Sequence, residues 1–476
     1  MYAPDARRPL TPPLLEALRR LLGERVSTGA SVLAQHGRDE SAFAPMPPDA
    51  VAFPRSTEEV AAIARLCHAH DVPMIPYGVG SSVEGHVLAV RGGVSIDLAQ
   101  MNRVVEVHAE DLDVVVQAGV TRKQLDGELK GTGLFFPLDP GADASFGGMA
   151  ATRASGTNAV RYGTMRENVL ALTVVLADGT VLKTGTRARK SSAGYDLTRL
   201  FVGSEGTLGI VTEVTLRLHP QPEAVSAATC PFPSVRDAVE TVIQTIQLGV
   251  PIARCELLDA ASIRAINRHG RLGLDAGSGA GPRPLPEMPM LFLEFHGSPP
   301  AVAEQAETVQ AIAADHGGTG FEWSATPEER TRLWTARHNC YFACLNLRPN
   351  ARVVSTDVCV PLSRLADCIA ATEADVQASG LPIILLGHVG DGNFHLGINV
   401  DPAAHGEMER AEDLNRRLVS RAIEMGGTST GEHGIGMGKL EFLEAEHGAA
   451  AVATMRAIKR ALDPKGLMNP GKVIPA

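Results

Sequence analysis

Apolar positions follow two different spacings along the chain, which predicts a mixture of helices and strands. Helical spacing of apolar residues marks the segments 14–22, 56–70, 233–249, 300–316, 407–425 and 449–462. Short apolar or alternating runs between them predict strands at 72–76, 94–98, 114–119, 168–176, 214–218, 290–295, 352–361, 383–386 and 396–400. An α+β fold is therefore expected.

The positions of helix and turn signals divide the chain into parts. The 476 residues allow two or three domains at about 150 residues each. The first 45 residues predict only a short helical lead-in, and the Pro-rich break at 219–222 ends a run of strands. We therefore expect the parts 1–45, 46–222 and 223–476.

The stretch 383–396 carries the clearest chemical pattern. An apolar run enters a Gly-Asp-Gly-Asn turn, and an alternating segment leaves it. Asp-Gly favours the left-handed positions of a two-residue hairpin turn, so we expect Asp391 and Gly392 to form the turn and His388 to pair with His395. Paired residues hold their Cβ atoms roughly 5 Å apart on one face of the hairpin. Two imidazoles so placed can bind one metal ion.

A third metal ligand is available at Glu432, which lies in the Gly-flanked pair Glu432-His433. Two imidazoles and one carboxylate suit a borderline divalent metal such as zinc or manganese. Single histidines in strands are mostly structural, and two of them seven residues apart also arise by chance, so a structural role stays open.

A glycine-rich loop at 76–85 is the second chemical pattern. Consecutive backbone N–H groups in a Gly/Ser turn form a site for an anion such as a diphosphate. The loop lacks the third glycine of a Rossmann fingerprint, because Val83 stands there, and it lacks the Lys-Ser or Lys-Thr of a Walker A loop. A plain turn remains the alternative. The segment 136–163 is also rich in small residues, which lets backbone lie against something flat and buried.

Composition narrows the possible partners. The net charge of −10, the pI of about 5.9 and the aromatic content of 4% offer neither a field nor stacking surfaces for nucleic acid. The seven cysteines include no Cys-x-x-Cys pair, which is typical of free thiols in a reducing compartment. No apolar run approaches the ~18 residues of a membrane span, and no secretory signal is expected at the start.

Several of these segments together resemble a known family. The loop at 76–85 and the segments 139–148, 161–163 and 203–209 resemble the FAD-binding domain of the vanillyl-alcohol-oxidase (PCMH-type) class of flavoproteins. The segments 333–339, 355–361, 387–395, 431–439 and 467–473 resemble the FAD-linked oxidase C-terminal domain, in particular that of FAD-linked D-lactate dehydrogenases. The resemblance begins near residue 46 and runs to the end.

The resemblance implies two α+β subdomains that bind FAD, followed by a substrate and metal domain with an antiparallel sheet and helices. The loop 77–82 would hold the diphosphate, and Asn469 would close over the isoalloxazine ring. FAD would be non-covalent, because His86, the candidate for a covalent link, lies beyond the expected place. The implied FAD contacts are Pro76, Tyr77, Gly78, Val79, Gly80, Ser81, Ser82, Pro140, Gly141, Ala142, Gly147, Gly148, Ser155, Gly156, Glu205, Gly206, Ile210 and Asn469.

Flavin and metal together suit the oxidation of a 2-hydroxy acid, and the resemblance implies D-lactate, or a related D-2-hydroxy acid, as the substrate and pyruvate or the matching 2-oxo acid as the product. A metal held by His388, His395 and Glu432 would lower the pKa of the substrate hydroxyl. His433 would act as the base, and Arg337 would bind the substrate carboxylate with a two-pronged fork. A cytochrome or a quinone is the implied electron acceptor, and the protein is expected in the cytoplasm, with at most a peripheral contact to the inner membrane.

Other functions remain open at this point. Glycolate and D-2-hydroxyglutarate carry the same reacting group as lactate. A metallohydrolase could use the same His, His, Glu set, although it would have no use for the segments at 76–85 and 139–163. A non-catalytic flavin-binding subunit of a larger complex is the third class.

Overall fold

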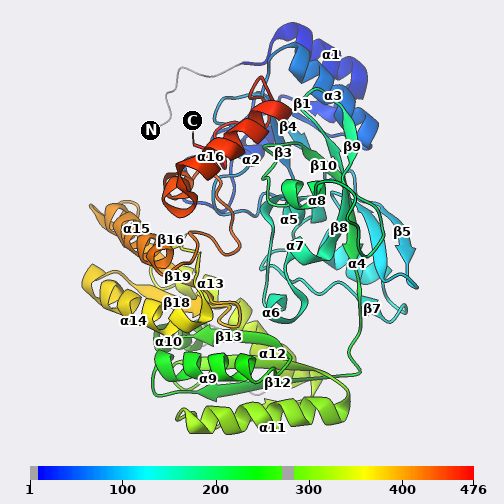
Figure 1. Ribbon diagram of the computed structural model, residues 1–476. Coiled ribbons are helices and arrows are strands. Elements are labelled where there is room, and N and C mark those ends of the chain that lie inside the picture. Colours follow the sequence, from blue (N-terminus) through cyan, green and yellow to red (C-terminus); the bar gives the residue numbers. More distant parts are fainter. Residues whose placement is uncertain (1–8, 271–283, 476) are drawn as a thin grey trace. The chain divides into compact units, whose positions relative to one another are not determined.

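The computed structural model describes residues 9–270 and 284–475 (Figure 1). Its fold is α+β, as the mixed spacing of apolar residues predicted. The chain forms two compact units. The first contains the residues up to Gly156 together with Gly163–Gln221 and Glu432–Ala476, and the second contains Thr157–Tyr162 and Pro222–Gly431.

This division differs from the expected parts in where the last segment belongs. Residues 432–476 group with the first unit, although they were expected within the part 223–476. Leu467 and Met468 are fully buried in the same apolar cluster as Met74, and Met74 and Met468 form a parallel bridge. Burial of these apolar side chains draws the end of the chain back to the first unit.

The first unit is built on two larger sheets and one small one. The first sheet has the order β1-β2-β4-β3, in which β2 and β3 both run parallel to β4. The second is antiparallel with the order β5-β6-β10-β8-β9, and β7 pairs with β11. The strands are β1 Val26–Ser27, β2 Ala50–Ala52, β3 Met74–Tyr77, β4 Val94–Asp97, β5 Val104–His108, β6 Asp113–Gln117, β7 Leu134–Phe135, β8 Val169–Val175, β9 Val181–Lys183, β10 Ile210–Arg217 and β11 His219–Pro220.

Helix α3 shows how the sequence sets the local structure of this unit. Ser56 Oγ accepts a hydrogen bond of 3.3 Å from the backbone N–H of Glu59 and so caps the N-terminus of the helix. Val60, Ile63 and Cys67 are fully buried on the face that joins the core. The helices here are α1 Pro12–Leu22, α2 Ala30–His36, α3 Thr57–Ala69, α4 Arg122–Glu128, α5 Phe146–Thr152, α7 Met165–Asn168, α8 Leu197–Phe201 and α16 Leu443–Leu462, with short 3-10 turns at Gly23–Arg25 and Leu440–Phe442.

The second unit contains one eight-stranded sheet with the order β15-β12-β14-β13-β18-β19-β16, in which β17 also pairs with β19. Its pairings are antiparallel, as expected for the C-terminal part. The strands are β12 Ala224–Pro231, β13 Ile252–Leu258, β14 Met290–Gly297, β15 Glu322–Ser324, β16 Arg352–Ser355, β17 Val358–Cys359, β18 Ile383–Gly387 and β19 Asn393–Val400.

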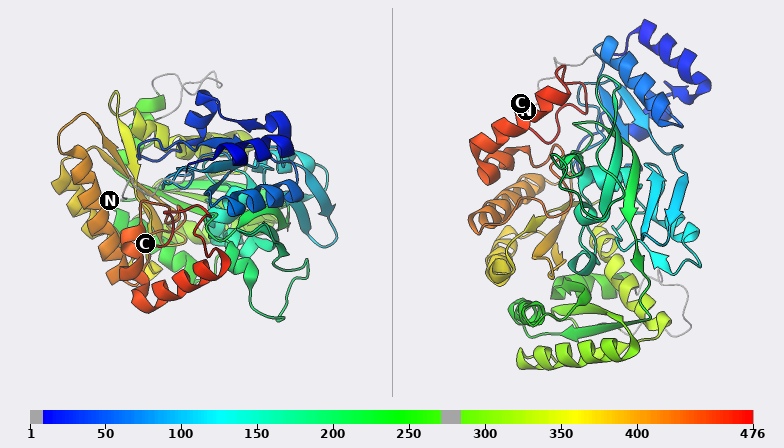
Figure 2. Two further views of the ribbon diagram at one scale, coloured as in Figure 1. Left: turned by 90° about the horizontal axis from the view of Figure 1, so that it is seen from above. Right: turned by 45° about the vertical axis from the view of Figure 1, so that its right-hand side comes forward.

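Helices cover both faces of this sheet (Figure 2). On one face, residues of α10, α12 and α13 form an apolar cluster with Leu258, Phe292 and Ile384 of the strands. On the other face α9 and α11 pack against the strands, and α14 packs beside α9. The helices are α6 Ala159–Tyr162, α9 Val235–Gln247, α10 Ala260–Gly270, α11 Pro299–Asp315, α12 Pro327–His338, α13 Cys340–Leu345, α14 Leu362–Ser379 and α15 Glu407–Glu424.

The hairpin of β18 and β19 corrects the predicted register. Leu386 pairs with His395, and the backbone N–H of Asn393 bonds to His388 O, so the turn is the loop 389–392 and not Asp391-Gly392 alone. Gly392 has φ +79°, and a Cβ there would lie 2.1 Å from Val360 O. The four-residue loop ends at Gly392, which has the left-handed conformation that Asp-Gly sequences favour, so the sequence signal was correct and only the loop length was not.

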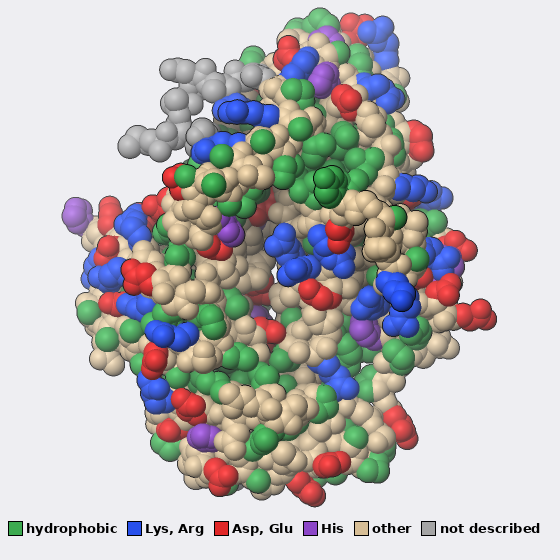
Figure 3. Space-filling model, in the orientation of Figure 1, with side chains coloured by type: hydrophobic (Ala, Val, Ile, Leu, Met, Phe, Trp, Pro, Cys, Tyr) green, Lys and Arg blue, Asp and Glu red, His purple; other side chains and the backbone are tan. Residues whose placement is uncertain are grey.

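The helices, the surface and the cysteines add three observations. Among residues 9–270 and 284–475, no helix is both long and apolar enough to cross a membrane. On the face shown in Figure 3, acidic and basic side chains both occur and are interspersed with uncharged ones. All seven cysteines are free thiols.

Candidate active-site residues

His388 and His395 lie side by side in the second unit in spite of the changed register. Their ring centroids are 5.5 Å apart and the rings are nearly perpendicular. Each offers a ring nitrogen within 4.8 Å of the other, a separation that one metal ion can bridge. Both side chains are buried, with exposed fractions of 8% and 5%. His388 lies between the end of β18 and the loop 389–392, and His395 belongs to β19 and pairs with Leu386, so the two histidines are neighbours without being a cross-strand pair.

The Nδ1 atoms of the two histidines are both held by oxygen atoms. His388 Nδ1 lies 2.7 Å from Glu256 Oε1, and His395 Nδ1 lies 3.0 Å from Thr356 O. A carboxylate or carbonyl on one ring nitrogen fixes the ring orientation and makes the opposite nitrogen, Nε2, the better metal ligand. This donor set fits a divalent metal.

Glu256 links His388 to Arg337. Its Oε2 accepts from Arg337 Nε at 3.0 Å and lies 2.7 Å from Nη2. Burial alone would raise the pKa of Glu256, but the charges of His388 and Arg337 outweigh burial, and the pKa is lowered. The Nε edge of Arg337 is therefore engaged within the protein, so the predicted fork to a substrate would have to use the Nη1–Nη2 end.

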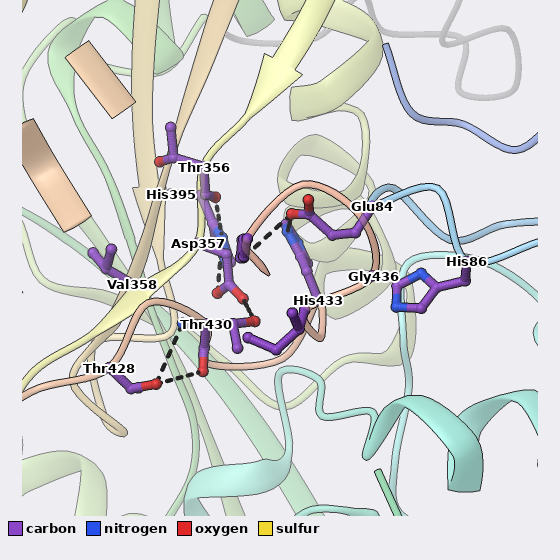
Figure 4. A network of polar contacts seen from close by, with 12 residues as sticks. Glu84, His86, Thr356, Asp357, Val358, His395, Thr428, Thr430, His433 and Gly436 are labelled. Atoms are coloured by element: carbon purple, nitrogen blue, oxygen red, sulfur yellow. Dashed lines mark hydrogen bonds and ion pairs between the residues drawn. The ribbon is translucent and has the colours of Figure 1, made fainter. Parts of the chain in front are cut away.

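A second buried carboxylate, Asp357, organises the segments beside His395 (Figure 4). Asp357 accepts hydrogen bonds from Asn393 Nδ2 at 2.8 Å and from Thr430 Oγ1 at 2.6 Å, and it lies 3.6 Å from His395 Nδ1. A Cβ on Gly431 would meet Asn393 at 2.3 Å, so only glycine fits there. The chain reaches Glu432 directly after this anchored glycine.

Glu432 and His433 belong to the first unit, where nearby glycines bring their backbone close to other segments. A Cβ on Gly436 would lie 2.2 Å from Glu84 O, and a Cβ on Gly434 would lie 2.6 Å from Glu205 Oε1. His433 Nδ1 lies 3.9 Å from Glu84 Oε1 (Figure 4), and Lys439 Nζ lies 3.2 Å from the same oxygen.

The loop after β3 has the properties expected of a diphosphate site. Within the described part of the chain, the backbone N–H groups of residues 78–82 have no acceptor. Residue 80 has φ +70°, which glycine adopts without strain. Asn469 contacts the chain before and after this loop. Its backbone N–H donates to Met74 O at 2.8 Å, and its Nδ2 donates to His86 O at 3.0 Å.

A buried atom of Asn469 supports the same assignment. Asn469 Oδ1 and Ser204 Oγ are buried and lack a partner among the described residues. Buried polar atoms are almost always hydrogen-bonded in proteins, so a bound polar group is expected beside them. Together with the N–H groups of 78–82, these atoms fit FAD.

Some of the other expected FAD contacts are explained by packing within the protein itself. A Cβ on Gly147 would meet Ala118 Cβ at 2.6 Å, and one on Gly206 would meet Pro76 Cγ at 2.9 Å. The Ile210 side chain belongs to the apolar core of β10. Gly141 and Ala142 are exposed, and a Cβ on Gly141 would meet nothing within 4 Å. Contacts with FAD through the backbone stay a prediction for these residues.

Sequence reasoning missed Glu256, Thr356 and Asp357. Glu256 stands in the otherwise mostly apolar strand β13, and a charge in such a strand was a usable signal. Asp357 lies within the segment 355–361 on which the resemblance was based, but its partners Asn393 and Thr430 come from distant parts of the sequence.

Comparison with known proteins identifies two family domains in this chain. Residues 48–185 match the family of FAD binding domains, and residues 221–473 match the family of FAD linked oxidases, C-terminal domain. A probable mitochondrial D-lactate dehydrogenase of Danio rerio is 52% identical over 97% of this chain and 91% of its own length. A mitochondrial D-lactate dehydrogenase [cytochrome] of Arabidopsis thaliana is 47% identical over 97% of this chain and 80% of its own length.

Two further comparisons widen the picture. A glycolate oxidase subunit of Bacillus subtilis is 35% identical over 90% of this chain and 89% of its own length. The solved structure of p-cresol methylhydroxylase has a TM-score of 0.79 at 19% identity, covering 97% of this chain and 96% of that chain, and shows the likeness in fold.

The fold and these matches define the class of the protein, a flavoprotein with a PCMH-type FAD-binding domain and hence an FAD-dependent oxidoreductase. The chain belongs to the family of FAD-linked oxidases. The resemblance inferred from the sequence is confirmed.

Proposed function

We propose that this protein is an FAD- and divalent-metal-dependent dehydrogenase that oxidises D-lactate, or a related D-2-hydroxy acid, to the 2-oxo acid. The observation that carries the proposal is the His388 and His395 pair, whose Nδ1 atoms are held by Glu256 and Thr356, in a chain with an FAD-binding domain. A metallohydrolase would not need that domain.

The FAD diphosphate would bind the N–H groups of residues 78–82, and a polar group of the cofactor would bind Asn469 Oδ1. When bound, FAD supplies a two-electron acceptor for the hydrogen on the substrate's C2 atom. His86 Nε2 lies 3.0 Å from Glu205 and is buried, which supports a non-covalent cofactor.

The metal would bind His388 Nε2, His395 Nε2 and the Glu432 carboxylate, which suits zinc or manganese. A bound metal polarises the substrate hydroxyl and lowers its pKa. Glu432 follows Gly431, which is itself packed against Asn393 and Asp357.

The proton of the substrate hydroxyl would pass to His433 Nε2, since the Nδ1 side of this ring faces Glu84. Arg337 would bind the substrate carboxylate through its Nη1–Nη2 end while its Nε edge stays on Glu256. This arrangement would orient the C2 hydrogen of the substrate without direct contact between Glu256 and the substrate.

D-Lactate is the favoured substrate because the relatives with 52% and 47% identity are named as D-lactate dehydrogenases. Glycolate is the second candidate, which the relative from Bacillus subtilis favours. A cytochrome is the favoured acceptor, because the Arabidopsis relative is named a D-lactate dehydrogenase [cytochrome], and a quinone is the alternative. The free cysteines suit a reducing compartment such as the cytoplasm. The relatives of Danio rerio and Arabidopsis thaliana are named as mitochondrial, so a mitochondrial location is the alternative.

A dye-reduction assay tests the proposal. The purified protein, loaded with FAD and zinc or manganese, is offered D- and L-lactate, glycolate and D-2-hydroxyglutarate with an artificial electron acceptor. We expect reduction with D-lactate, little with L-lactate, and FAD in the supernatant after denaturation. Absence of dye reduction with every 2-hydroxy acid would exclude the proposal, and flavin that stays with the denatured chain would exclude the non-covalent part.

A further inference from the structure

The carboxylate of Glu205 holds a backbone segment in the first unit. Its Oε1 accepts from the N–H of Ile435 at 2.7 Å, and its Oε2 accepts from the N–H of Gly436 at 2.8 Å. His86 Nε2 lies 3.0 Å from Oε2. Sequence reasoning placed Glu205 among the FAD contacts, whereas its two oxygen atoms are engaged by the chain itself.

The backbone around Glu205 is built for this contact. Glu205 has φ +52°, a left-handed conformation that is uncommon for a residue with a side chain. Its N–H bonds to Ala151 O at 2.9 Å, and its carbonyl accepts from Asn469 Nδ2 at 2.8 Å. Strain of this kind persists only where the surrounding structure fixes it, and it gathers at functional positions.

Glycines on the opposite side allow the close approach. Gly434 has φ +83°, and a Cβ there would lie 2.6 Å from Glu205 Oε1 and 3.0 Å from His86 Nε2. Gly436 has φ +48°. The segment can therefore lie on the Glu205 carboxylate because Gly434 has no side chain, whereas a Cβ on Gly436 would meet Glu84 O at 2.2 Å.

Glu205 is buried, and its surroundings favour the charged form of its carboxylate. Burial alone would raise the pKa of Glu205, but His86 and the N–H groups of Ile435 and Gly436 outweigh it, and the pKa is lowered. Burial likewise would lower the pKa of His86, but Glu205 outweighs it and the pKa is raised. Both shifts favour the charged forms of the two side chains, which lie 3.0 Å apart, and a buried charge is costly unless it is paired and hydrogen-bonded.

We propose that Glu205, paired with His86, is a positioning residue that fixes the segment 432–436 and thereby the placement of Glu432 and His433. The inference rests on the proposed function for the roles of those two residues. Just before this segment, Thr430 Oγ1 donates a hydrogen bond of 2.6 Å to the buried carboxylate of Asp357. Two buried carboxylates therefore fix the chain on either side of the proposed metal ligand and base.

The expected consequence is an effect on metal affinity that does not depend on loss of FAD. Groups that orient a metal ligand are worth about 10–100-fold in metal affinity. Glu205→Gln keeps the size of the side chain but replaces one acceptor oxygen by an NH₂ group, which opposes the N–H of Ile435 or Gly436. The segment should loosen while the loop 78–82 is unchanged.

The experiment compares Glu205→Gln with Glu59→Gln in the FAD-loaded protein. Glu59 is a matched control, because it pairs with Arg25 at 2.6 Å and accepts a hydrogen bond of 2.8 Å from the N–H of Arg55 in the same unit, away from segment 432–436.

Amide hydrogen exchange at residues 435 and 436 should speed up about tenfold or more in Glu205→Gln, as loss of hydrogen bonds to a charged group implies. Zinc or manganese affinity should fall by about 10–100-fold, with FAD retained. Both quantities should stay at the wild-type value in Glu59→Gln.

Two results would overturn the inference. One is unchanged amide exchange at 435 and 436 in Glu205→Gln. The other is loss of FAD with unchanged exchange, which would return the Glu205 carboxylate to the cofactor site. If Glu205→Gln does not fold, His86→Gln is measured in the same way, because it removes the charged partner and leaves the carboxylate in place. If the wild type binds no metal, the proposed function fails, while amide exchange still tests the positioning role.

Discussion

Glu256 Oε1 lies 2.7 Å from His388 Nδ1, and the two side chains form a buried contact within the second unit. The other carboxylate oxygen is taken by Arg337. One carboxylate thus sets the orientation of a proposed metal ligand and of a proposed substrate-binding residue. Removing its charge should affect both.

Glu256→Gln should lower metal affinity by about 10–100-fold and raise the KM for D-lactate, because His388 and Arg337 both lose a charged partner. Metal content and steady-state kinetics at controlled free zinc measure the two effects. The control is Glu407→Gln, which removes another Arg–Glu pair of the same unit, with Arg348. Equal metal affinity in the two variants would contradict a role for Glu256 in holding His388.

His388→Ala and His395→Ala should each abolish metal binding and dye reduction while FAD is retained, since the FAD contacts proposed here lie in the first unit. Elemental analysis and the flavin absorbance of the same samples give both quantities. His316→Ala serves as the control, because His316, at the end of α11, forms a hydrogen bond of 2.8 Å with Gln244 of α9. Full activity in a metal-free His388→Ala sample would remove the metal from the proposed function.

The fold was predictable from the sequence wherever a local rule decides the outcome. The Ser56 cap, the apolar face of α3 and the hairpin across Asp178-Gly179 all follow from neighbouring residues, and the structure pairs Thr173 with Lys183 there. The turn between His388 and His395 was predicted too short. Asp-Gly signals a left-handed position, but the close approach of Gly392 to Val360 O decides the loop length, and this is a tertiary contact.

For the candidate site, too, contacts between residues far apart in the sequence were not predictable. The histidines and Glu432 were visible in the sequence because their residue types are typical of metal ligands. The charge of Glu256 in a mostly apolar strand was a usable signal, but the partners of Glu256 and Asp357 lie far away in the sequence, so their contacts were not predictable from it. Glu205 was visible through its glycine-rich surroundings, but only the structure shows what its carboxylate contacts.

His219 should make stability depend on pH in mildly acidic solution. Burial, aided by the charge of Arg217, lowers the pKa of His219 to about 4. In the unfolded chain the pKa is about 6.5, so the unfolded state binds a proton that the folded state refuses as pH falls from about 6.5 to about 4. The wild type should lose stability relative to His219→Gln across this window and show a constant difference above it. Melting temperatures of both proteins between pH 4 and pH 8 test this, and parallel curves would contradict it.

Glu432 and His433 are neighbours in sequence with different proposed roles, and three variants separate them. Glu432→Gln keeps the size but loses the charge, so metal affinity should fall. His433→Asn keeps a polar group but loses the base, so metal and substrate should still bind while flavin reduction slows by about two to four orders of magnitude. Arg337→Lys keeps the charge but loses the fork, so its main effect should be a weaker affinity for the substrate.

Rapid-mixing measurement of flavin reduction at saturating D-lactate decides between these roles, with metal content assayed on the same samples. A wild-type rate in His433→Asn would place the base elsewhere. Loss of metal from His433→Asn, with metal retained in Glu432→Gln, would exchange the roles of the two residues. His433 Nδ1 lies 3.9 Å from Glu84 Oε1, so Glu84→Gln should slow flavin reduction less than His433→Asn does, because it disturbs the orientation of the base and leaves its Nε2 atom in place.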